Sequence, residues 1–144
     1  MTWKSMAALA AALAAATVAA AAAHAQPAPL SPTDIVGRHI AAGNAGDLDA
    51  MAGDYADDAV VLQPGQAVQG KAAIRAMFAG IFGPGAPKMT ITPPKVWQEG
   101  EVGFVTWTAN GGAIRGQDSF LVKNGKIEAQ AVFIGAPPAP PAGP

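Results

Sequence analysis

From residue 31 to residue 85 the apolar residues recur at intervals of three and four, a spacing typical of amphipathic helices. A first helix is predicted to begin at Ser31, which can cap it, with Asp34 in the acidic position of a capping box. Asp47 is predicted to cap a second helix, whose apolar side includes Tyr55. A third helix follows Gly70. The N-terminal half of the chain therefore predicts three helices.

Strands are predicted between the second and third helices and throughout the C-terminal half. Asp57 and Asp58 are interpreted as cap and turn residues that lead into a short strand at 59–63. After residue 85 the apolar residues alternate with period two, in the segments 89–98, 102–110, 113–123 and 126–134. Turns rich in glycine and asparagine join these segments, so they predict an antiparallel meander. The expected fold class is α+β, with three N-terminal helices packed on a curved antiparallel sheet.

The first 25 residues differ in character from the rest. Lys4 precedes a long run of alanine, leucine and valine that ends in Ala23-His24-Ala25. This order is typical of a secretory signal peptide cleaved after Ala25, with a membrane anchor as the alternative, and it predicts a periplasmic or secreted protein. The expected organisation is a signal peptide at 1–25, a linker at 26–33, a domain at 34–135 and a disordered proline-rich tail at 136–144.

Composition narrows the classes of partner and cofactor. Without residues 1–25, eight Lys and Arg stand against ten Asp and Glu, with no basic stripe, so neither nucleic acid nor an anionic membrane is an expected partner. The chain has no cysteine, and an apolar core must stabilise it without disulfides. His39 is the only histidine after cleavage, so no metal site is predicted. No phosphate-binding glycine motif follows a predicted strand, and no cofactor is expected.

One position of the predicted meander places a carboxyl group on an apolar face. Residues 114, 116, 118, 120 and 122 alternate onto one side of their strand, so Asp118 shares that side with Phe120. A buried carboxyl either finds hydrogen bonds or takes up a proton. Asp118 is therefore interpreted either as a pocket residue or as a structural carboxyl that pairs with Arg115, Arg75 or the backbone.

Three stretches of the chain carry a resemblance to a known family: HIAAGNAGDLDAMAGDYADDAVVLQPG, QGKAAIRAMF and QDSFLVKNGKI. They resemble the SnoaL-like branch of the NTF2-like superfamily, which includes the ketosteroid isomerases, from about residue 35 to residue 135. The resemblance implies an NTF2-like cone enclosing a pocket, and a homodimer paired through the outer face of the sheet. This branch contains isomerases, cyclases, dehydratases, epoxide hydrolases and members without known catalysis, so it implies a pocket and not one reaction.

The functional residues of the ketosteroid isomerases map by motif onto three positions. The general base corresponds to Gln63, the tyrosine of the first helix to His39, and the late carboxylic acid to Asp118. A glutamine amide cannot take up a proton near neutral pH, so steroid isomerisation by the family route is not expected. The resemblance also implies that His39 and Asp118 meet across the cavity as a His/Asp dyad. The alternative is that His39 is a core histidine bonded to the backbone or to water.

Three functions remain open from the sequence. The first is an exported pocket protein that binds a small apolar molecule, and the second is a cofactor-free acid/base enzyme of the isomerase, cyclase or dehydratase type that uses His39 and Asp118. The third is a structural or partner-binding module. Trp97 is expected to pack on the sheet, and Tyr55 is predicted mainly as a core residue. The expected pocket residues are Tyr55, Gln63, Phe78, Trp107 and Phe120.

Overall fold

The computed structural model describes residues 28–92 and 95–135. The predicted signal peptide, the predicted tail and the Pro93-Pro94 pair lie outside the described residues. None of the helices in the described part of the chain is long and apolar enough to span a membrane.

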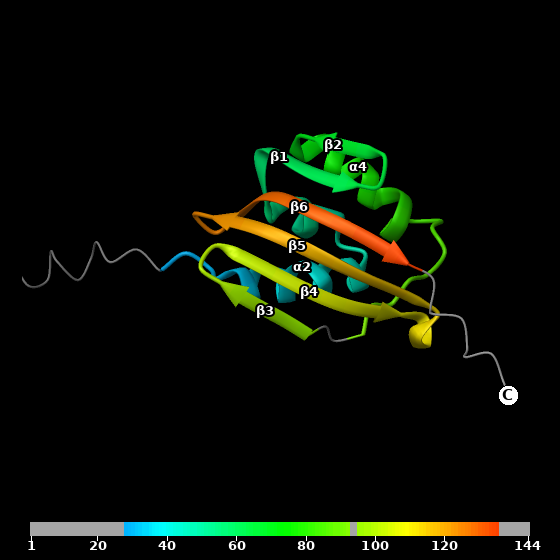
Figure 1. The fold of residues 1–144 in the computed structure, drawn as a ribbon. Coiled ribbons are helices and arrows are strands. Elements are labelled where there is room, and N and C mark those ends of the chain that lie inside the picture. Colours follow the sequence, from blue (N-terminus) through cyan, green and yellow to red (C-terminus); the bar gives the residue numbers. More distant parts are fainter. Residues whose placement is uncertain (1–27, 93–94, 136–144) are drawn as a thin grey trace, which may run out of the picture.

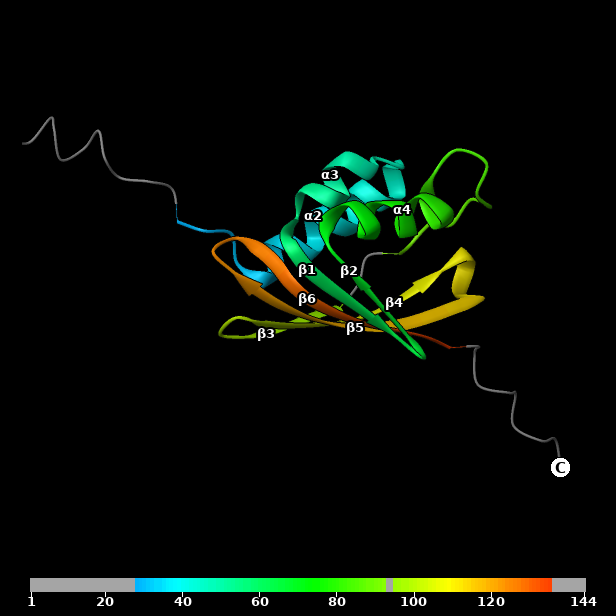
Figure 2. The same cartoon turned by 90° about the horizontal axis from the view of Figure 1, so that it is seen from above.

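One six-stranded sheet and a layer of helices make up the described fold (Figure 1). The helices are α2 (Pro32–Ala45), α3 (Leu48–Gly53) and α4 (Lys71–Phe82), with a 3-10 turn, η1 (Asn110–Gly112). The strands are β1 (Tyr55–Gln63), β2 (Gln66–Gln69), β3 (Lys95–Glu99), β4 (Val102–Ala109), β5 (Ile114–Lys123) and β6 (Lys126–Gly135). Their order across the sheet is β2-β1-β6-β5-β4-β3. Figure 2 shows that α2, α3 and α4 all lie on one face of the sheet.

The capping box predicted for the first helix is present in α2. The Ser31 hydroxyl accepts a hydrogen bond from the Asp34 backbone N–H, and the Asp34 carboxylate accepts one from the Ser31 backbone N–H, both at 3.2 Å. The helix ends at Gly46, whose φ of 72° lies in the left-handed region that favours glycine. Local sequence therefore sets both ends of the helix that carries His39.

The α+β fold class is confirmed, and the sheet is mixed where the sequence predicted an antiparallel one. Strands β3 to β6 form the predicted antiparallel meander, but β1 pairs in parallel with β6. Strand β2 was not predicted, because the short polar segment QAVQ has no apolar alternation to indicate it. It pairs back on β1 through the turn at Pro64-Gly65.

Two predicted boundaries were wrong. Strand β1 begins at Tyr55, so Tyr55 is not on a helix and Asp57 and Asp58 lie within the strand instead of capping or turning it. An irregularity in the pairing of β1 with β6 between Tyr55 and Val60 accommodates these two exposed carboxylates. The strand predicted at 89–98 is reduced to β3, preceded by an isolated bridge between Ile91 and Ala109.

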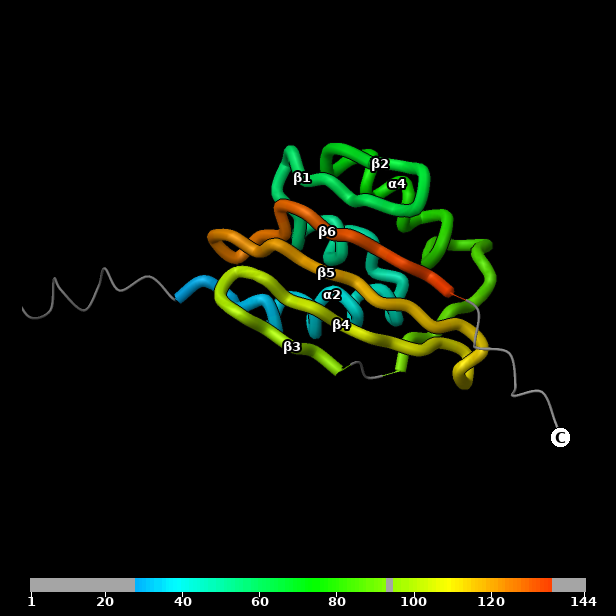
Figure 3. The backbone as a smooth tube through the Cα atoms, in the orientation of Figure 1, coloured from blue at the N-terminus to red at the C-terminus, as the bar shows by residue number. Residues whose placement is uncertain are grey.

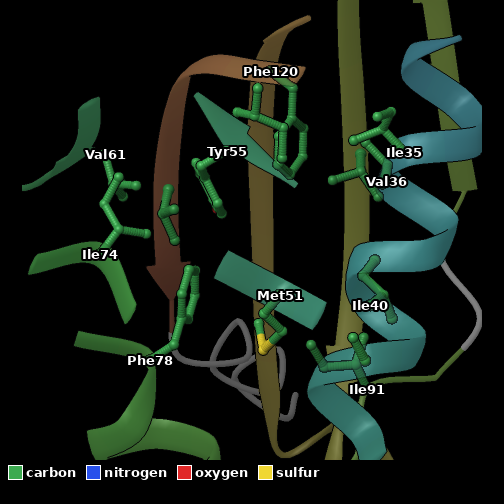
Figure 4. Close-up of a cluster of buried hydrophobic side chains, with 14 of the residues drawn as sticks. Ile35, Val36, Ile40, Met51, Tyr55, Val61, Ile74, Phe78, Ile91 and Phe120 are labelled. Atoms are coloured by element: carbon green, nitrogen blue, oxygen red, sulfur yellow. The ribbon is translucent and has the colours of Figure 1, made fainter. Parts of the chain in front are cut away.

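The core fills the space between the helices and the inner face of the sheet (Figure 4). Ile35 and Val36 from α2 meet Phe120 from β5, while Ile74 and Phe78 from α4 pack toward β1. Between α4 and β3 the chain passes from one edge of the sheet to the other, as the tube in Figure 3 shows. This passage carries Met89 and Ile91 to the wall of a cavity.

Gly116 of β5 lies directly under the indole of Trp107 on β4, its partner in the strand register. A Cβ atom on Gly116 would collide with the indole ring. We therefore expect Gly116→Ala to lower the free energy of unfolding by about 1–3 kcal/mol, because the rigid ring must move within a packed layer. Urea denaturation measures the change. Gly135→Ala is the matched control, since nothing lies within 4 Å of its added Cβ; equal losses in the two variants would contradict the packing argument.

Candidate functional site

An apolar cavity lies between α2, α4 and the inner face of the sheet. Most of its wall consists of aliphatic, aromatic and methionine side chains, among them Ile40, Met51, Phe78, Phe82, Met89 and Ile91. Four polar side chains also border it, namely His39, Gln63, Asp118 and Gln130. A mainly apolar pocket with a few convergent polar groups is the usual form of a small-molecule site.

The cavity is small, with a volume of about 50 Å³. Because one ordered water needs roughly 10–15 Å³, this space holds a few waters. A pocket for a drug-sized ligand measures about 300–1,000 Å³, so a ligand the size of a steroid would require side chains of the wall to move. Phe82 and Met89 are only partly buried, so these two side chains of the wall have room to rotate.

The structure brings most of the predicted site residues to this cavity. His39, Gln63, Phe78, Trp107 and Asp118 all border it. Tyr55 and Phe120, which were expected in the pocket, do not border it and lie fully buried behind its wall. Trp97, expected to pack on the sheet, lies half-exposed and contacts Phe104 with ring centroids 5.8 Å apart.

Asp118 is buried and is held by one hydrogen bond. The Gln130 amide Nε2 donates to Asp118 Oδ2 at 3.3 Å, and Asp118 Oδ1 has no hydrogen-bond partner among the described residues. Burial raises the pKa of Asp118 to about 6, while the nearby N–H groups of Trp107 and Gln130 act to lower it. The structural pairings considered from the sequence are not formed, since Arg75 binds Asp49 at 2.7 Å and Arg115 is exposed.

The direct contact between His39 and Asp118 that the sequence analysis expected is not formed. The carboxylate beside His39 is Asp54, whose Oδ2 lies 3.6 Å from His39 Nδ1. His39 Nε2 lies 3.5 Å from the hydroxyl of Tyr55. The ring also makes an edge contact with Phe78, with centroids 5.3 Å apart. A catalytic role for His39 and Asp118 therefore stays a prediction, with a different geometry from the one expected.

Asp54 is a site residue that sequence reasoning missed. Its side chain is almost inaccessible, and Oδ1 accepts a hydrogen bond from Nε of the half-exposed Arg38 at 2.7 Å and forms an ion pair with Nη2 of the same residue. A charged hydrogen bond of this kind offsets the burial of the carboxylate. The sequence contains one indication of this role: Arg38 and His39 are neighbours on a helix with a buried stripe, and such a pair requires a carboxylate nearby. Three acidic residues lie between positions 54 and 58, and the sequence does not show which of them is the partner.

Gln130 was also missed, and it connects Tyr55 with Asp118. The Tyr55 hydroxyl donates to Gln130 Oε1, while the Gln130 amide donates to Asp118. Burial, followed by the charges of Asp118 and Asp54, raises the pKa of Tyr55, so its hydroxyl keeps its proton. His39 of α2, Tyr55 of β1, Gln130 of β6 and Asp118 of β5 thus form a continuous polar row through an otherwise apolar layer.

Gln63 borders the cavity, and its amide Nε2 lies 3.1 Å from the sulfur of Met77 on α4. An amide orients a ligand without exchanging a proton with it. In the part of the chain that the structure describes, no three His, Asp or Glu side chains gather in a way that would hold a metal ion.

A layer of helices on one face of a curved mixed sheet, with an apolar cavity between the two layers, defines the NTF2-like class of α+β proteins. Within that class, the sequence model of the SnoaL-like domain matches residues 36–130. The chain therefore belongs to the SnoaL-like domain family. A comparison with curated proteins found no match.

Solved structures share this fold. An NTF2-like protein of unknown function from Burkholderia xenovorans is similar with a TM-score of 0.63 and 22% identity, over 76% of this chain and 86% of that one. A protein provisionally assigned as a polyketide cyclase, from Sinorhizobium meliloti, has a TM-score of 0.62 and 26% identity, over 69% and 94%. One provisionally assigned as a ketosteroid isomerase, from Kribbella flavida, has a TM-score of 0.62 and 18% identity, over 76% and 81%. These likenesses establish the fold.

The raised pKa of Asp118 predicts how stability depends on pH. Between about pH 4 and pH 6 the folded protein holds a proton that the unfolded chain, with its ordinary pKa of 3.8, has released. The free energy of unfolding therefore falls as pH rises through this window, by about 3 kcal/mol at about 1.4 kcal/mol per pH unit. In Asp118→Asn this loss is absent. The stability of the variant relative to the wild type therefore increases from about pH 4 to about pH 6 and stays constant at higher pH.

Urea denaturation at pH 4, 5, 6 and 7 measures the difference between wild type and variant. Ser119→Ala serves as the control, because it changes an exposed residue of the same strand without removing an ionisable group. Its free energy of unfolding should differ from that of the wild type by the same amount at every pH. A difference for Asp118→Asn that does not vary with pH would refute the assigned pKa.

Proposed function

We propose that this SnoaL-like protein binds a small, mainly apolar molecule that presents one carbonyl or hydroxyl oxygen to Asp118. The observation that carries the proposal is Asp118 Oδ1, a buried carboxyl oxygen without a hydrogen-bond partner among the described residues, at the wall of an apolar cavity. An unpartnered buried polar atom costs about 1–3 kcal/mol. A ligand hydroxyl would donate the missing hydrogen bond to the Asp118 carboxylate, and a ligand carbonyl would accept one from protonated Asp118, while apolar atoms fill the rest of the space.

The size of the cavity supports a compact ligand. With about 50 Å³ available before any side chain moves, a single ring would displace fewer side chains of the wall than a fused ring system. Gln63 stands at the position of the family's general base, and its amide faces Met77. Both observations argue against steroid isomerisation.

The second candidate is a cofactor-free acid/base enzyme of the isomerase, cyclase or dehydratase type. It is favoured by the pKa of Asp118, which at about 6 allows the group to exist both as an acid and as a base near neutral pH. A protonated carboxyl in an apolar site can donate to a developing oxyanion, and a carboxylate can accept a proton from carbon. His39, also at the cavity wall, supplies a second group able to exchange a proton.

Export and dimerisation belong to the same proposal. Export rests on the signal-peptide pattern of residues 1–25, and its test is the N-terminal residue of the protein recovered from the cell envelope, expected to be Gln26. A homodimer is supported by the outer face of the sheet, which the helices leave uncovered (Figure 2). One row in the strand register crosses this face with Leu62, Ala131, Ser119, Phe104 and Trp97.

The ligand proposal predicts selective binding of oxygen-bearing compounds. We expect monocyclic ketones to raise the melting temperature below about pH 6, and hydrocarbons of the same shape to raise it less, because protonated Asp118 can donate a hydrogen bond to the ketone oxygen alone. Asp118→Leu should weaken ketone binding about two- to tenfold, since a hydrogen bond between neutral groups contributes about 0.5–1.5 kcal/mol. Thermal shift and native mass spectrometry measure both effects.

The control for this comparison is Ser119→Ala, which leaves the cavity untouched. Equal affinity for ketone and hydrocarbon, or ketone binding that Asp118→Leu leaves unchanged, would argue against the proposal. If a ketone of the panel is also isomerised or dehydrated, Asp118→Asn should slow turnover about 10²- to 10⁴-fold, the usual contribution of a general acid or base.

The homodimer proposal predicts that charge on the outer face separates the protomers. Trp97 and Phe133 are 51% and 53% exposed on this face, so the double variant Trp97→Glu, Phe133→Glu should shift the mass in light scattering from dimer to monomer. Lys88→Glu, in the loop after α4, is the control for added negative charge. A wild-type protein that stays monomeric at high concentration would exclude this dimer.

A further inference from the structure

The row from His39 to Asp118 has a property that none of its members has alone, because hydrogen-bond directions must agree along its whole length. The Tyr55 hydroxyl has one proton, so it donates to one neighbour and accepts from the other. The Gln130 amide has a donor end and an acceptor end, one toward each neighbour. The direction of the bond at Asp118 therefore fixes the direction required at His39.

In the first arrangement the Gln130 amide donates to Asp118, which is a carboxylate, and Tyr55 donates to Gln130. Tyr55 then has only a lone pair left for His39 Nε2, so this nitrogen must carry a hydrogen. His39 Nδ1 lies 3.6 Å from the Asp54 carboxylate, longer than a hydrogen bond, and the negative charge there favours a hydrogen on Nδ1. His39 is therefore protonated on both nitrogens when Asp118 is ionised.

The second arrangement reverses the inner links of the row. A protonated Asp118 donates to the oxygen of a turned Gln130 amide, whose nitrogen donates to Tyr55. Tyr55 then donates to His39 Nε2, which must be unprotonated, while Nδ1–H continues to face Asp54. The two ends of an amide have nearly the same shape, so turning it over requires no additional space.

Both arrangements contain the same number of protons and have the same net charge. If Asp118 and His39 were both protonated, either two donors would meet at Tyr55 and His39, or the Asp118 proton would lie on Oδ1, which has no hydrogen-bond partner among the described residues. If neither were protonated, two lone pairs would meet at Tyr55 and His39. Each mismatch leaves a buried polar group unsatisfied. The row therefore favours one proton, held at one end or at the other.

We propose that Tyr55 and Gln130 form a reversible hydrogen-bond chain that couples His39 to Asp118, so that one group binds a proton as the other releases one. A catalytic use of this chain rests on the proposed acid/base function described above. Because Asp118 borders the cavity, this exchange would let it act as an acid toward a ligand oxygen when His39 is neutral, and as a base toward a ligand C–H when His39 holds the proton. A carbonyl compound with an acidic C–H next to the carbonyl is the class of substrate that gives and receives protons in this way.

The surroundings of the two end groups are consistent with this exchange. Asp54 faces His39 from the start of β1, and its partner Arg38 lies beside His39 on α2. Trp107 of β4 lies near Asp118, while α4 contributes the uncharged Phe78. Within the described residues, the charges of Arg38 and Asp54 balance. The net charge at the site stays the same whichever end of the row holds the proton. Asp54, Tyr55 and Gln130 are positioning residues in this scheme.

The experiment follows both end groups by NMR in the ligand-free mature protein, in which His39 is the only histidine. Ring ¹⁵N shifts report the proton occupancy of His39, and the side-chain ¹³C shift reports that of Asp118. In the wild type the two occupancies should add up to about one across a range of pH around neutrality, as expected for a strongly coupled pair.

Tyr55→Phe and Gln130→Met each interrupt the chain without adding charge, and two variants guard against a failure of one to fold. In either variant the summed occupancy should fall steadily as pH rises, because each group then titrates by itself. Gln98→Met, which removes a glutamine that bonds Thr33 on the surface, is the matched control and should keep the wild-type sum.

Independent titration of His39 and Asp118 in the wild type would overturn the proposed coupling. Coupling that survives in both interrupted variants would also overturn it, since the two groups would then interact directly through space. No ligand takes part in this experiment. Intact coupling without ligand binding would therefore reject the proposed function and leave the chain, whereas ligand binding without coupling would reject the chain alone.

Discussion

A carboxyl group inside an apolar layer is the constraint on which the rest of the site depends. Asp118 is buried, so it needs a hydrogen-bond partner, which Gln130 supplies. Gln130 in turn bonds Tyr55, whose hydroxyl faces His39. His39 faces Asp54, whose partner Arg38 reaches solvent. One buried polar group thus requires a sequence of partners that crosses the domain, from the cavity to the surface.

The mixed sheet determines where these partners lie. Because β5 and β6 are antiparallel neighbours, Asp118 and Gln130 project from adjacent strands onto the same inner face. The parallel pairing of β1 with β6 brings Tyr55 beside Ile127, near enough for its hydroxyl to reach Gln130. Toward the neighbouring strand β4, Gly116 of β5 leaves room for the Trp107 indole at the cavity wall. Backbone topology, and not local sequence, assembles the row.

The family shares this scaffold more widely than it shares a reaction. By the motif resemblance, Gln63 corresponds to the isomerase base, and its amide contacts a methionine sulfur. By the same resemblance, His39 corresponds to the tyrosine of the first helix and Asp118 to the late acid. In this chain a tyrosine from a different element, Tyr55, stands in the polar row. The cavity therefore has the architecture of its class and its own arrangement of acidic and basic groups.

The sequence by itself determined the features that a few neighbouring residues encode. The capping box at Ser31, the apolar stripe of α4, the antiparallel meander and the inward face of Asp118 all follow from periodicity and turn chemistry, and the family motifs determined the fold class. The start of β1, the pairing of β2, and the roles of Asp54 and Gln130 were decided only by the tertiary structure. Tyr55 and Gln130 lie 75 residues apart in the chain, and no local pattern records which distant polar groups will satisfy one another. That choice is made when the core closes, because only then does each buried donor or acceptor lose its water and need a partner.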